Sequence, residues 1–129
     1  MYLLDTCTWL WLVNGDDERF SADARKALDG AERLRVGVIS CWEVANLAAL
    51  GRIHLARDLD TWIDEALSVA KIELIPLSLK VAIESTRLPG VFHRDPADRI
   101  LVATARAEGL QMITPDEKIR SYPHVQSVW

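Results

Sequence analysis

The sequence lacks the features of a membrane or secreted protein. No apolar run in its 129 residues approaches the roughly 18 residues that a membrane-spanning helix needs. The first residues, MYLLDTCTWLWLV, are apolar, but they include Asp5 and lack both a basic segment and a small-residue cleavage site, so we expect no signal peptide. The only cysteines, Cys7 and Cys41, are expected to be free thiols in a reducing compartment. Together these absences predict a cytoplasmic protein that makes no contact with a membrane.

The chain also lacks an excess of basic residues, internal repeats and linker-like segments. Its formal net charge is −4, so bulk charge alone cannot hold a nucleic acid through its phosphates. No low-complexity tract or Pro/Gly-rich stretch divides the chain, and half of its residues are hydrophobic. We therefore expect a single domain over residues 1–129, in which any attraction for a phosphodiester is local.

Short β-branched runs alternate with longer segments of helical periodicity. The runs that predict strands are residues 2–5, 34–40, 72–77, 110–114 and 125–129. The segments that predict helices are residues 21–31, 41–51, 56–70, 78–88 and 96–109. This alternation predicts an α/β fold with a mostly parallel sheet and helices on both faces, in which ligands bind at the carboxyl ends of the strands.

Acidic residues follow several of these strands, and each has a local explanation as a helix cap. Asp5 ends the first strand and is placed to cap the next helix. Ser40 and Glu43 have the S-x-x-E spacing of a capping box. Thr114 is placed to cap a helix that begins at Pro115. Taken one at a time, these residues require no function.

Two further acidic positions have the same local reading. Asp95 before Pro96 suits an N-cap, which leaves Asp98 at the third helical position. Asp116 falls in the first turn after Thr114, where the helix dipole favours negative charge.

The predicted topology nevertheless brings Asp5, Glu43, Asp98 and Asp116, which we call the acidic quartet, to one edge of the sheet. Carboxylates this close repel each other, and a hard divalent cation is the usual remedy. Mg²⁺ or Mn²⁺ fits oxygen ligands and could activate a water for phosphodiester hydrolysis. Zinc is disfavoured because the three histidines are scattered and the cysteines show no C-x-x-C spacing.

Four short motifs, in order, resemble the PIN domain. They are the strand ending in Leu-Leu-Asp-Thr at residues 3–6, S-x-W-E-V-A-N-L at 40–47, H-R-D-P-A-D-R-I-L-V-A-T-A at 93–105 and I-T-x-D at 113–116. More narrowly, they resemble the VapC-type toxins of bacterial toxin–antitoxin pairs, over essentially the whole chain. The resemblance implies an α/β/α sandwich, a Mg²⁺- or Mn²⁺-dependent ribonuclease activity and inhibition by a small cognate antitoxin. It also implies homodimers and toxin–antitoxin assemblies that bind operator DNA through the antitoxin.

The resemblance assigns the catalytic and metal-binding roles to the acidic quartet. Asp98 matches the aspartate that precedes the family's A-T-A helix, and Asp95 is then expected to support it. Thr6 and Thr114 would place hydroxyls near the metal, with simple capping or turn formation as the alternative for each.

Basic residues near these motifs are candidates for holding RNA phosphates. They are Arg94, Arg99 and Lys118, and the alternative is that they are surface charges or ion-pair partners of the neighbouring acids. His93 either contacts RNA or completes a loop.

An excess of tryptophan and leucine suggests a partner-binding surface. The candidates are Trp9, Trp11, Trp42, Leu47 and Leu50, and for any single tryptophan a place in the core is the alternative. By resemblance, the antitoxin's C-terminal segment would lie across residues 9–13 and 41–63.

Two other functions remain to be weighed against a ribonuclease toxin. The first is a non-catalytic binding module that docks a protein through its tryptophan-rich face, with the acids serving only as caps. The second is a phosphotransfer domain, which is disfavoured because no second acid lies beside Asp5 and position 7 is a cysteine.

Overall fold

Five parallel strands form one sheet in the order β3-β2-β1-β4-β5. The computed structural model describes all residues, 1–129. The strands are β1 (Tyr2–Leu4), β2 (Leu34–Gly37), β3 (Ile72–Ile75), β4 (Gln111–Ile113) and β5 (Ser127–Val128). All five predicted strands are confirmed, although each is shorter than the apolar run that predicted it.

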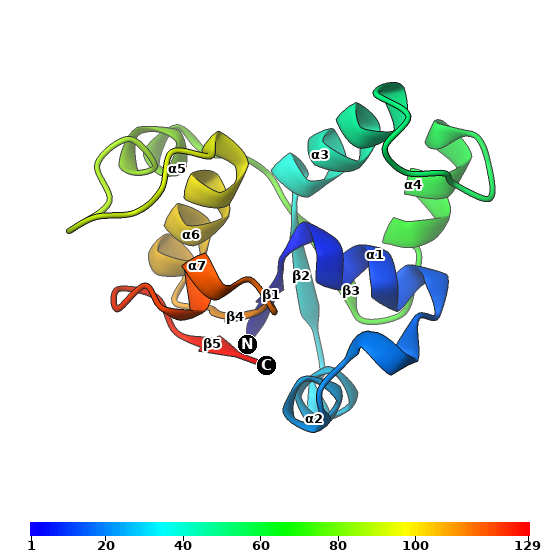
Figure 1. Ribbon diagram of the computed structural model, residues 1–129, viewed down its shortest axis with the longest axis horizontal. Coiled ribbons are helices and arrows are strands. Elements are labelled where there is room, and N and C mark those ends of the chain that lie inside the picture. Colours follow the sequence, from blue (N-terminus) through cyan, green and yellow to red (C-terminus); the bar gives the residue numbers. More distant parts are fainter.

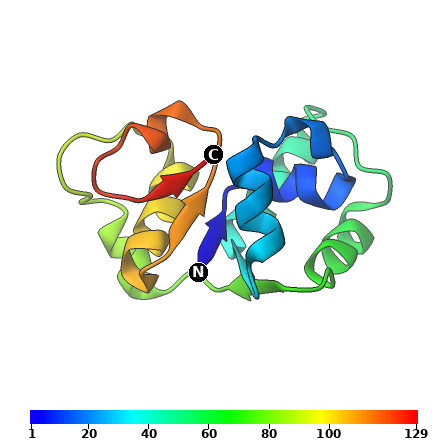
Figure 2. The ribbon, with the colours of Figure 1, turned by 90° about the horizontal axis from the view of Figure 1, so that it is seen from below.

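Helices cover both faces of this sheet. They are α1 (Thr6–Asn14), α2 (Ala22–Gly30), α3 (Val38–Ala49), α4 (Leu59–Leu67), α5 (Leu79–Glu84), α6 (Pro96–Glu108) and α7 (Glu117–Arg120), with a 3₁₀ turn at Asp17–Arg19. Seen from below, α5 and α6 lie in one half of the molecule, and α1, α2 and α4 lie in the other (Figure 2). The predicted α/β/α architecture is therefore confirmed. None of the helices has the length and apolar character needed to cross a lipid bilayer.

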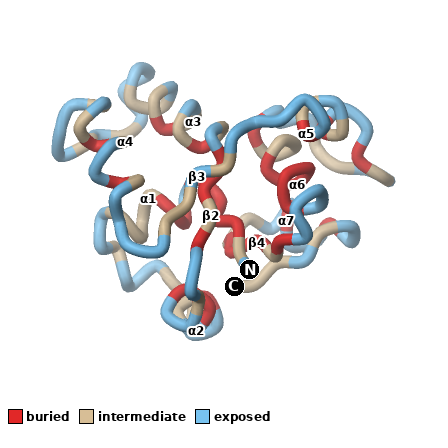
Figure 3. Tube along the Cα trace, turned by 180° about the vertical axis from the view of Figure 1, so that it is seen from behind, coloured by how far each residue is buried: buried red, intermediate tan, exposed pale blue.

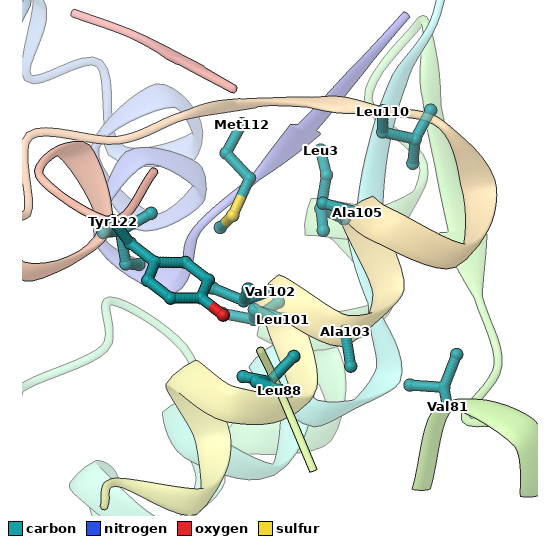
Figure 4. Close-up of a cluster of buried hydrophobic side chains, with 11 residues drawn as sticks. Leu3, Val81, Leu88, Leu101, Val102, Ala103, Ala105, Leu110, Met112 and Tyr122 are labelled. Atoms are coloured by element: carbon teal, nitrogen blue, oxygen red, sulfur yellow. The ribbon is translucent and has the colours of Figure 1, made fainter. Parts of the chain in front are cut away.

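Two apolar cores lie on opposite sides of the sheet because side chains alternate along each strand. Leu3 and Met112 belong to the core under α5, α6 and α7, where they meet Val102 (Figure 4). Their neighbours Leu4 and Ile113 belong to the second core, with residues of α1 to α4. Burial is greatest in the central strands and α6 (Figure 3), and each such leucine or methionine contributes roughly 1.5–3 kcal/mol to folding.

The strand order creates a switch point between β1 and β4. The chain passes from β1 to β2 and β3 on one side, and then returns to the other side of β1 to form β4 and β5 (Figure 1). In open parallel sheets, ligands bind beyond the carboxyl ends of the strands at such a point. Asp5 directly follows β1 and Thr114 directly follows β4, so both residues lie at this position.

Two of the predicted helix caps are confirmed. Asp5 is the N-cap of α1, and its Oδ1 accepts a hydrogen bond of 2.8 Å from the backbone N–H of Thr8. Asp95 is the N-cap of α6, with Pro96 at the first position, and its Oδ2 accepts from the N–H of Asp98 at 3.0 Å.

The capping box predicted at Ser40 is wrong. Strand β2 ends at Gly37, and α3 begins at Val38 with Gly37 as an N-cap that makes no side-chain hydrogen bond. Ser40 therefore lies inside the helix, where it is completely buried, and Glu43 lies in the second turn. Neither side chain serves the helix terminus, so both are free for contacts with other elements.

The cap predicted at Thr114 is also wrong. Asp116 is the N-cap of α7 and accepts from the N–H groups of Lys118 and Ile119 at 2.8 and 3.4 Å. Thr114 instead accepts from the N–H of Asp116 at 3.0 Å and donates its own hydroxyl to Asp5. Helix α7 therefore begins later than the sequence predicts. The hydroxyl of Thr114 bonds instead to Asp5, the residue that follows β1.

Candidate active site

Asp5 lies at the centre of the candidate site and is almost completely buried, with 6% of its surface exposed. Its Oδ2 accepts a hydrogen bond from the hydroxyl of Thr114, while Oδ1 accepts from Thr8. Burial raises the pKa of Asp5, and the charge of Asp116 adds to this, whereas the bonds from Thr114 and Thr8 lower it. These two bonds fix the orientation of a carboxylate that the surrounding protein desolvates.

Glu43 approaches Asp5 from α3. Thr6 donates to Oε1 of Glu43 at 2.5 Å, and the same hydroxyl is hydrogen bonded to Ser40 at 2.9 Å. Burial raises the pKa of Glu43, with further contributions from the charges of Asp95 and Asp5. The buried Ser40 therefore supports Thr6, and Thr6 in turn positions Glu43.

Asp98 reaches the same point from the first turn of α6. Its pKa is raised from 3.8 to about 7, first by burial and then by the charges of Asp95, Asp116, Glu43 and Asp5. Its side chain is 21% exposed, whereas Asp95 is exposed to solvent. The structure thus agrees with the expectation that Asp95 starts the helix and Asp98 faces the other acids.

Cys7, at the start of α1, lies close to all four of these charges. Burial raises the pKa of its thiol to about 11, and the charges of Asp5, Glu43, Asp116 and Asp98 add to that rise. All four members of the acidic quartet therefore act on one side chain at the start of α1. Both cysteines are free, as expected.

The quartet has no basic partner. None of its members forms an ion pair with a lysine or arginine, and only the ring of His93 lies near Asp98. Uncompensated carboxylates that raise one another's pKa are the chemical setting in which a hard cation binds. Glu43, Asp98 and Asp116 each keep part of their surface exposed, so the site is open to solvent rather than enclosed.

The arrangement of the quartet suits Mg²⁺ or Mn²⁺ better than zinc. No group of three or more acidic, histidine or cysteine side chains closes around a single point. Zinc sites need three or four protein ligands. Magnesium keeps several waters and is usually held by one or two carboxylates, which such an open set of oxygens can supply. The donor set present here therefore fits a hydrated, oxygen-preferring ion.

The structure gives Arg99 a role other than holding RNA. Its guanidinium donates to the carbonyl oxygens of Ser85, Phe92 and His93, at distances of 2.8, 3.0 and 3.1 Å. These bonds direct it into the loop before α6. The structure therefore supports a loop-bracing role for Arg99, and its contact with RNA stays a prediction. Arg94 and Lys118 are exposed and make no ion pair, so they remain candidates for RNA contact.

Trp9 is wrongly placed in the partner-binding surface. It is completely buried and packs edge-to-face against Trp62, with ring centroids 5.4 Å apart. Trp11 is half-buried against Phe20 and Trp129.

The α3 side chains keep the exposure that a partner-binding surface requires. Trp42 and Leu50 are 58% and 59% exposed, while Leu47 is half-buried. Their exposure favours α3 over α1 as the place for the predicted partner-binding surface.

Three contributors to the site were not identified from the sequence. The sequence predicts Ser40 as a helix cap and Cys7 as a free thiol. His93 was left between two roles. The signal that could have found Ser40 and Cys7 is their position three residues beyond a strand end, within two or three residues of a quartet member.

The family model for the PIN domain matches residues 2–125 of this chain. Ribonuclease VapC22 of Mycobacterium tuberculosis is 33% identical over 126 residues, which cover 98% of this chain and 95% of that protein. A toxin–antitoxin complex from Klebsiella pneumoniae contains a chain that superposes with a TM-score of 0.71 at 24% identity, covering 100% of this chain and 97% of that one.

VapBC2 of Rickettsia felis, bound to a DNA fragment from its promoter, has a chain that superposes with a TM-score of 0.70 at 16% identity, covering 98% of this chain and 96% of that one. These two structures support the fold, while the family match and VapC22 extend along nearly the whole sequence. The resemblance drawn from the motifs is confirmed: the chain belongs to the PIN-domain family and is a homologue of the VapC-type ribonuclease toxins.

Proposed function

We propose that this chain is a metal-dependent endoribonuclease that acts as the toxin of a toxin–antitoxin pair. The observation that carries the proposal is the convergence of Asp5, Glu43, Asp98 and Asp116 at the switch point of the sheet, with no basic partner. Residues that merely capped separate helices would have no reason to lie so close that the charges of Asp5, Glu43 and Asp116 add to the raised pKa of Asp98. The homology to ribonuclease VapC22 supports RNA as the substrate class.

One or two carboxylates of the acidic quartet would hold Mg²⁺ or Mn²⁺ directly, and the others would face its bound waters. Asp98 and Glu43 each use one carboxylate oxygen in a contact within the protein, which leaves Oδ1 of Asp98 and Oε2 of Glu43 to face the ion or its waters. Asp116 likewise uses Oδ1 for its cap and leaves Oδ2. When bound, the ion supplies an activated water and charge stabilisation for phosphodiester hydrolysis.

The residues around the quartet orient it. Thr8 and Thr114 fix Asp5, and Thr6 fixes Glu43, so two of the four carboxylates are held before any substrate arrives. Asp95 supports Asp98 by capping the helix that carries it. Preorganised carboxylates need little rearrangement to bind an ion in the productive geometry.

The open site suits a polymer. A phosphodiester chain can run across a surface site that would not retain a small molecule, and Arg94 and Lys118 supply exposed cations near the quartet for flanking phosphates. Since the chain carries a formal net charge of −4, metal and these local cations together would provide the attraction for RNA.

The proposed protein partner is an antitoxin bound to the apolar side chains of α3. The most exposed of these are Trp42, on α3, and Leu50, at its C-cap. Leu47 lies between them in the sequence and is half-buried. The fold relatives were solved as a toxin–antitoxin complex and as VapBC2 on promoter DNA. We propose that this chain likewise joins a cytoplasmic hetero-oligomer, as a homodimer, and reaches operator DNA only through the antitoxin.

The test is RNA cleavage by purified protein freed of any partner. We expect cleavage with Mg²⁺ or Mn²⁺, none after chelation, and a loss of at least about a hundredfold in the isosteric Asp5→Asn variant. Absence of cleavage and of ion binding, with an intact fold and retained partner binding, would contradict the proposal and favour the non-catalytic binding module.

A further inference from the structure

His93 lies at the edge of the acidic quartet, in the segment that leads into α6. Its Nε2 is 3.0 Å from Oδ2 of Asp98, and both side chains are largely buried, with 22% and 21% of their surfaces exposed. Nε2 itself is buried and makes no aligned hydrogen bond within the protein. The carboxylate of Asp98 is an acceptor that lies within reach of this nitrogen.

The other ring nitrogen defines which tautomer is present. The backbone N–H of Asp95 donates to Nδ1 of His93 at 3.4 Å, so Nδ1 is the acceptor of the ring. In a neutral imidazole, one nitrogen accepts and the other carries the hydrogen. The hydrogen of His93 is therefore on Nε2, on the side that faces Asp98.

The loop that carries His93 is tied to the body of the domain. Arg99 donates to the carbonyl oxygens of Ser85, Phe92 and His93, and the hydroxyl of Tyr122 donates to the carbonyl of Pro89. Phe92 also packs against Tyr122, with ring centroids 4.8 Å apart. These contacts fix the imidazole relative to α6 and thus relative to Asp98.

We propose that His93 is a positioning residue for Asp98: its Nε2–H holds Oδ2, so that Oδ1 stays turned toward the cation held by the acidic quartet. This inference rests on the proposed metal-dependent function. A buried donor without a partner is unfavourable, and closing the contact with Asp98 removes that cost. Outer contacts of this kind change metal affinity by roughly 10- to 100-fold when they are removed.

The test is the affinity of the full-length, partner-free chain for Mn²⁺, measured by titration calorimetry at a fixed, mildly alkaline pH. His93→Phe keeps a ring to pack against Phe92 but loses the N–H, and we expect its affinity to fall by roughly 10- to 100-fold. His93→Gln can place an amide N–H where Nε2 lies, and we expect it to bind within a few-fold of the wild type. His54→Phe, at an exposed histidine between α3 and α4, is the matched control and should bind as the wild type does.

The melting temperature of each variant without metal shows whether the fold is intact. An unchanged affinity in His93→Phe, or equal losses in the Phe and Gln variants, would overturn the positioning role while leaving the proposed function in place. Failure of the wild type itself to bind Mn²⁺ would overturn both. A lower Mn²⁺ affinity in His93→Phe, with near-wild-type affinity in His93→Gln, supports the inference. If His93 only filled space, the Phe variant would bind Mn²⁺ better than the Gln variant.

Discussion

The hydroxyl of Thr114 donates a hydrogen bond to Oδ2 of Asp5, joining two residues that lie 109 positions apart in the chain. Thr114 follows β4 and Asp5 follows β1, so this bond spans the switch point of the sheet. Both side chains are buried, and Asp5 has no basic partner. The bond therefore supports the carboxylate at the place where the fold most favours a ligand.

We expect Thr114→Val to lower the free energy of unfolding by about 1–3 kcal/mol, because it leaves a buried carboxylate with one donor fewer. The pKa of Asp5 should rise further for the same reason. Urea denaturation at neutral pH measures the change.

Thr8→Val is the matched control for this prediction. Thr8 is as buried as Thr114 but its hydroxyl makes no hydrogen bond of normal geometry, so its replacement by a methyl group should cost less stability than the loss of the Thr114 hydroxyl. Equal destabilisation by the two variants would show that the Thr114 hydroxyl has no special role.

The two tryptophans Trp9 and Trp42 should respond differently to truncation. Trp9→Ala removes a completely buried ring and should cost about 3–5 kcal/mol of stability. Trp42→Ala, at a side chain that is 58% exposed, should change stability by less than about 1 kcal/mol and weaken antitoxin binding by more than tenfold. Thermal melts and a binding titration separate the two effects, and undiminished antitoxin binding by Trp42→Ala would refute the partner surface on α3.

Arg99→Lys should loosen the loop before α6. A lysine cannot reproduce the planar fork that reaches the carbonyls of Ser85, Phe92 and His93, although it keeps the charge. We expect faster limited proteolysis and faster amide exchange over residues 85–93. Arg94→Lys, at an exposed neighbour, is the control and should leave both rates unchanged.

The stability of the metal-free protein should fall as pH rises from about 4 to about 8. The folded-state pKa values of Asp98, Asp5 and Glu43 are all raised, so the folded state binds protons more tightly than the unfolded chain does in this range. Stability is thus greatest below the ordinary carboxyl pKa and is lost as pH passes the folded value of about 7 for Asp98.

The expected size of this loss is set by Asp98. A rise in its pKa from 3.8 to about 7 corresponds to on the order of 4 kcal/mol, which its partial exposure reduces. Denaturation at several pH values, without metal and with Mg²⁺, measures it. Added Mg²⁺ should restore stability above neutral pH, and a flat profile in both series would count against the site.

The sequence predicted the order of strands and helices because the period of the apolar pattern changes clearly between them. It also predicted that the four acids come together, since strand ends in a parallel sheet meet at one edge, although Asp98 follows no strand; their role as metal ligands stays a prediction. The helix starts at Ser40 and Thr114 were wrong for one shared reason. Both hydroxyls have the local spacing of a helix cap. However, the hydroxyl of Ser40 bonds to Thr6 and that of Thr114 bonds to Asp5, two residues that come just after β1. Local spacing carries no information about such long-range contacts.

The side-chain roles of Trp9, Arg99 and His93 depend on tertiary packing in the same way. Trp9 is buried because Trp62, from α4, packs against it. Arg99 is directed into the loop before α6 because three backbone carbonyl oxygens accept hydrogen bonds from its guanidinium. His93 acquires a defined tautomer only where the chain turns into α6. Trp62 and Ser85 lie far from their partners in the sequence, and the contact between His93 and Asp98 depends on how the chain turns into α6, so the composition of a motif could not distinguish between the alternatives.

The central claim is that the quartet is a cation site rather than a set of helix caps, and Asp98→Asn tests it most directly. The measurement is the free energy of unfolding of the wild type and this variant at mildly alkaline pH, with and without Mn²⁺. We predict that the variant is more stable than the wild type without metal, because it removes one of several repelling carboxylates, and that Mn²⁺ no longer stabilises it. A variant that is less stable than the wild type and still stabilised by Mn²⁺ would contradict the account.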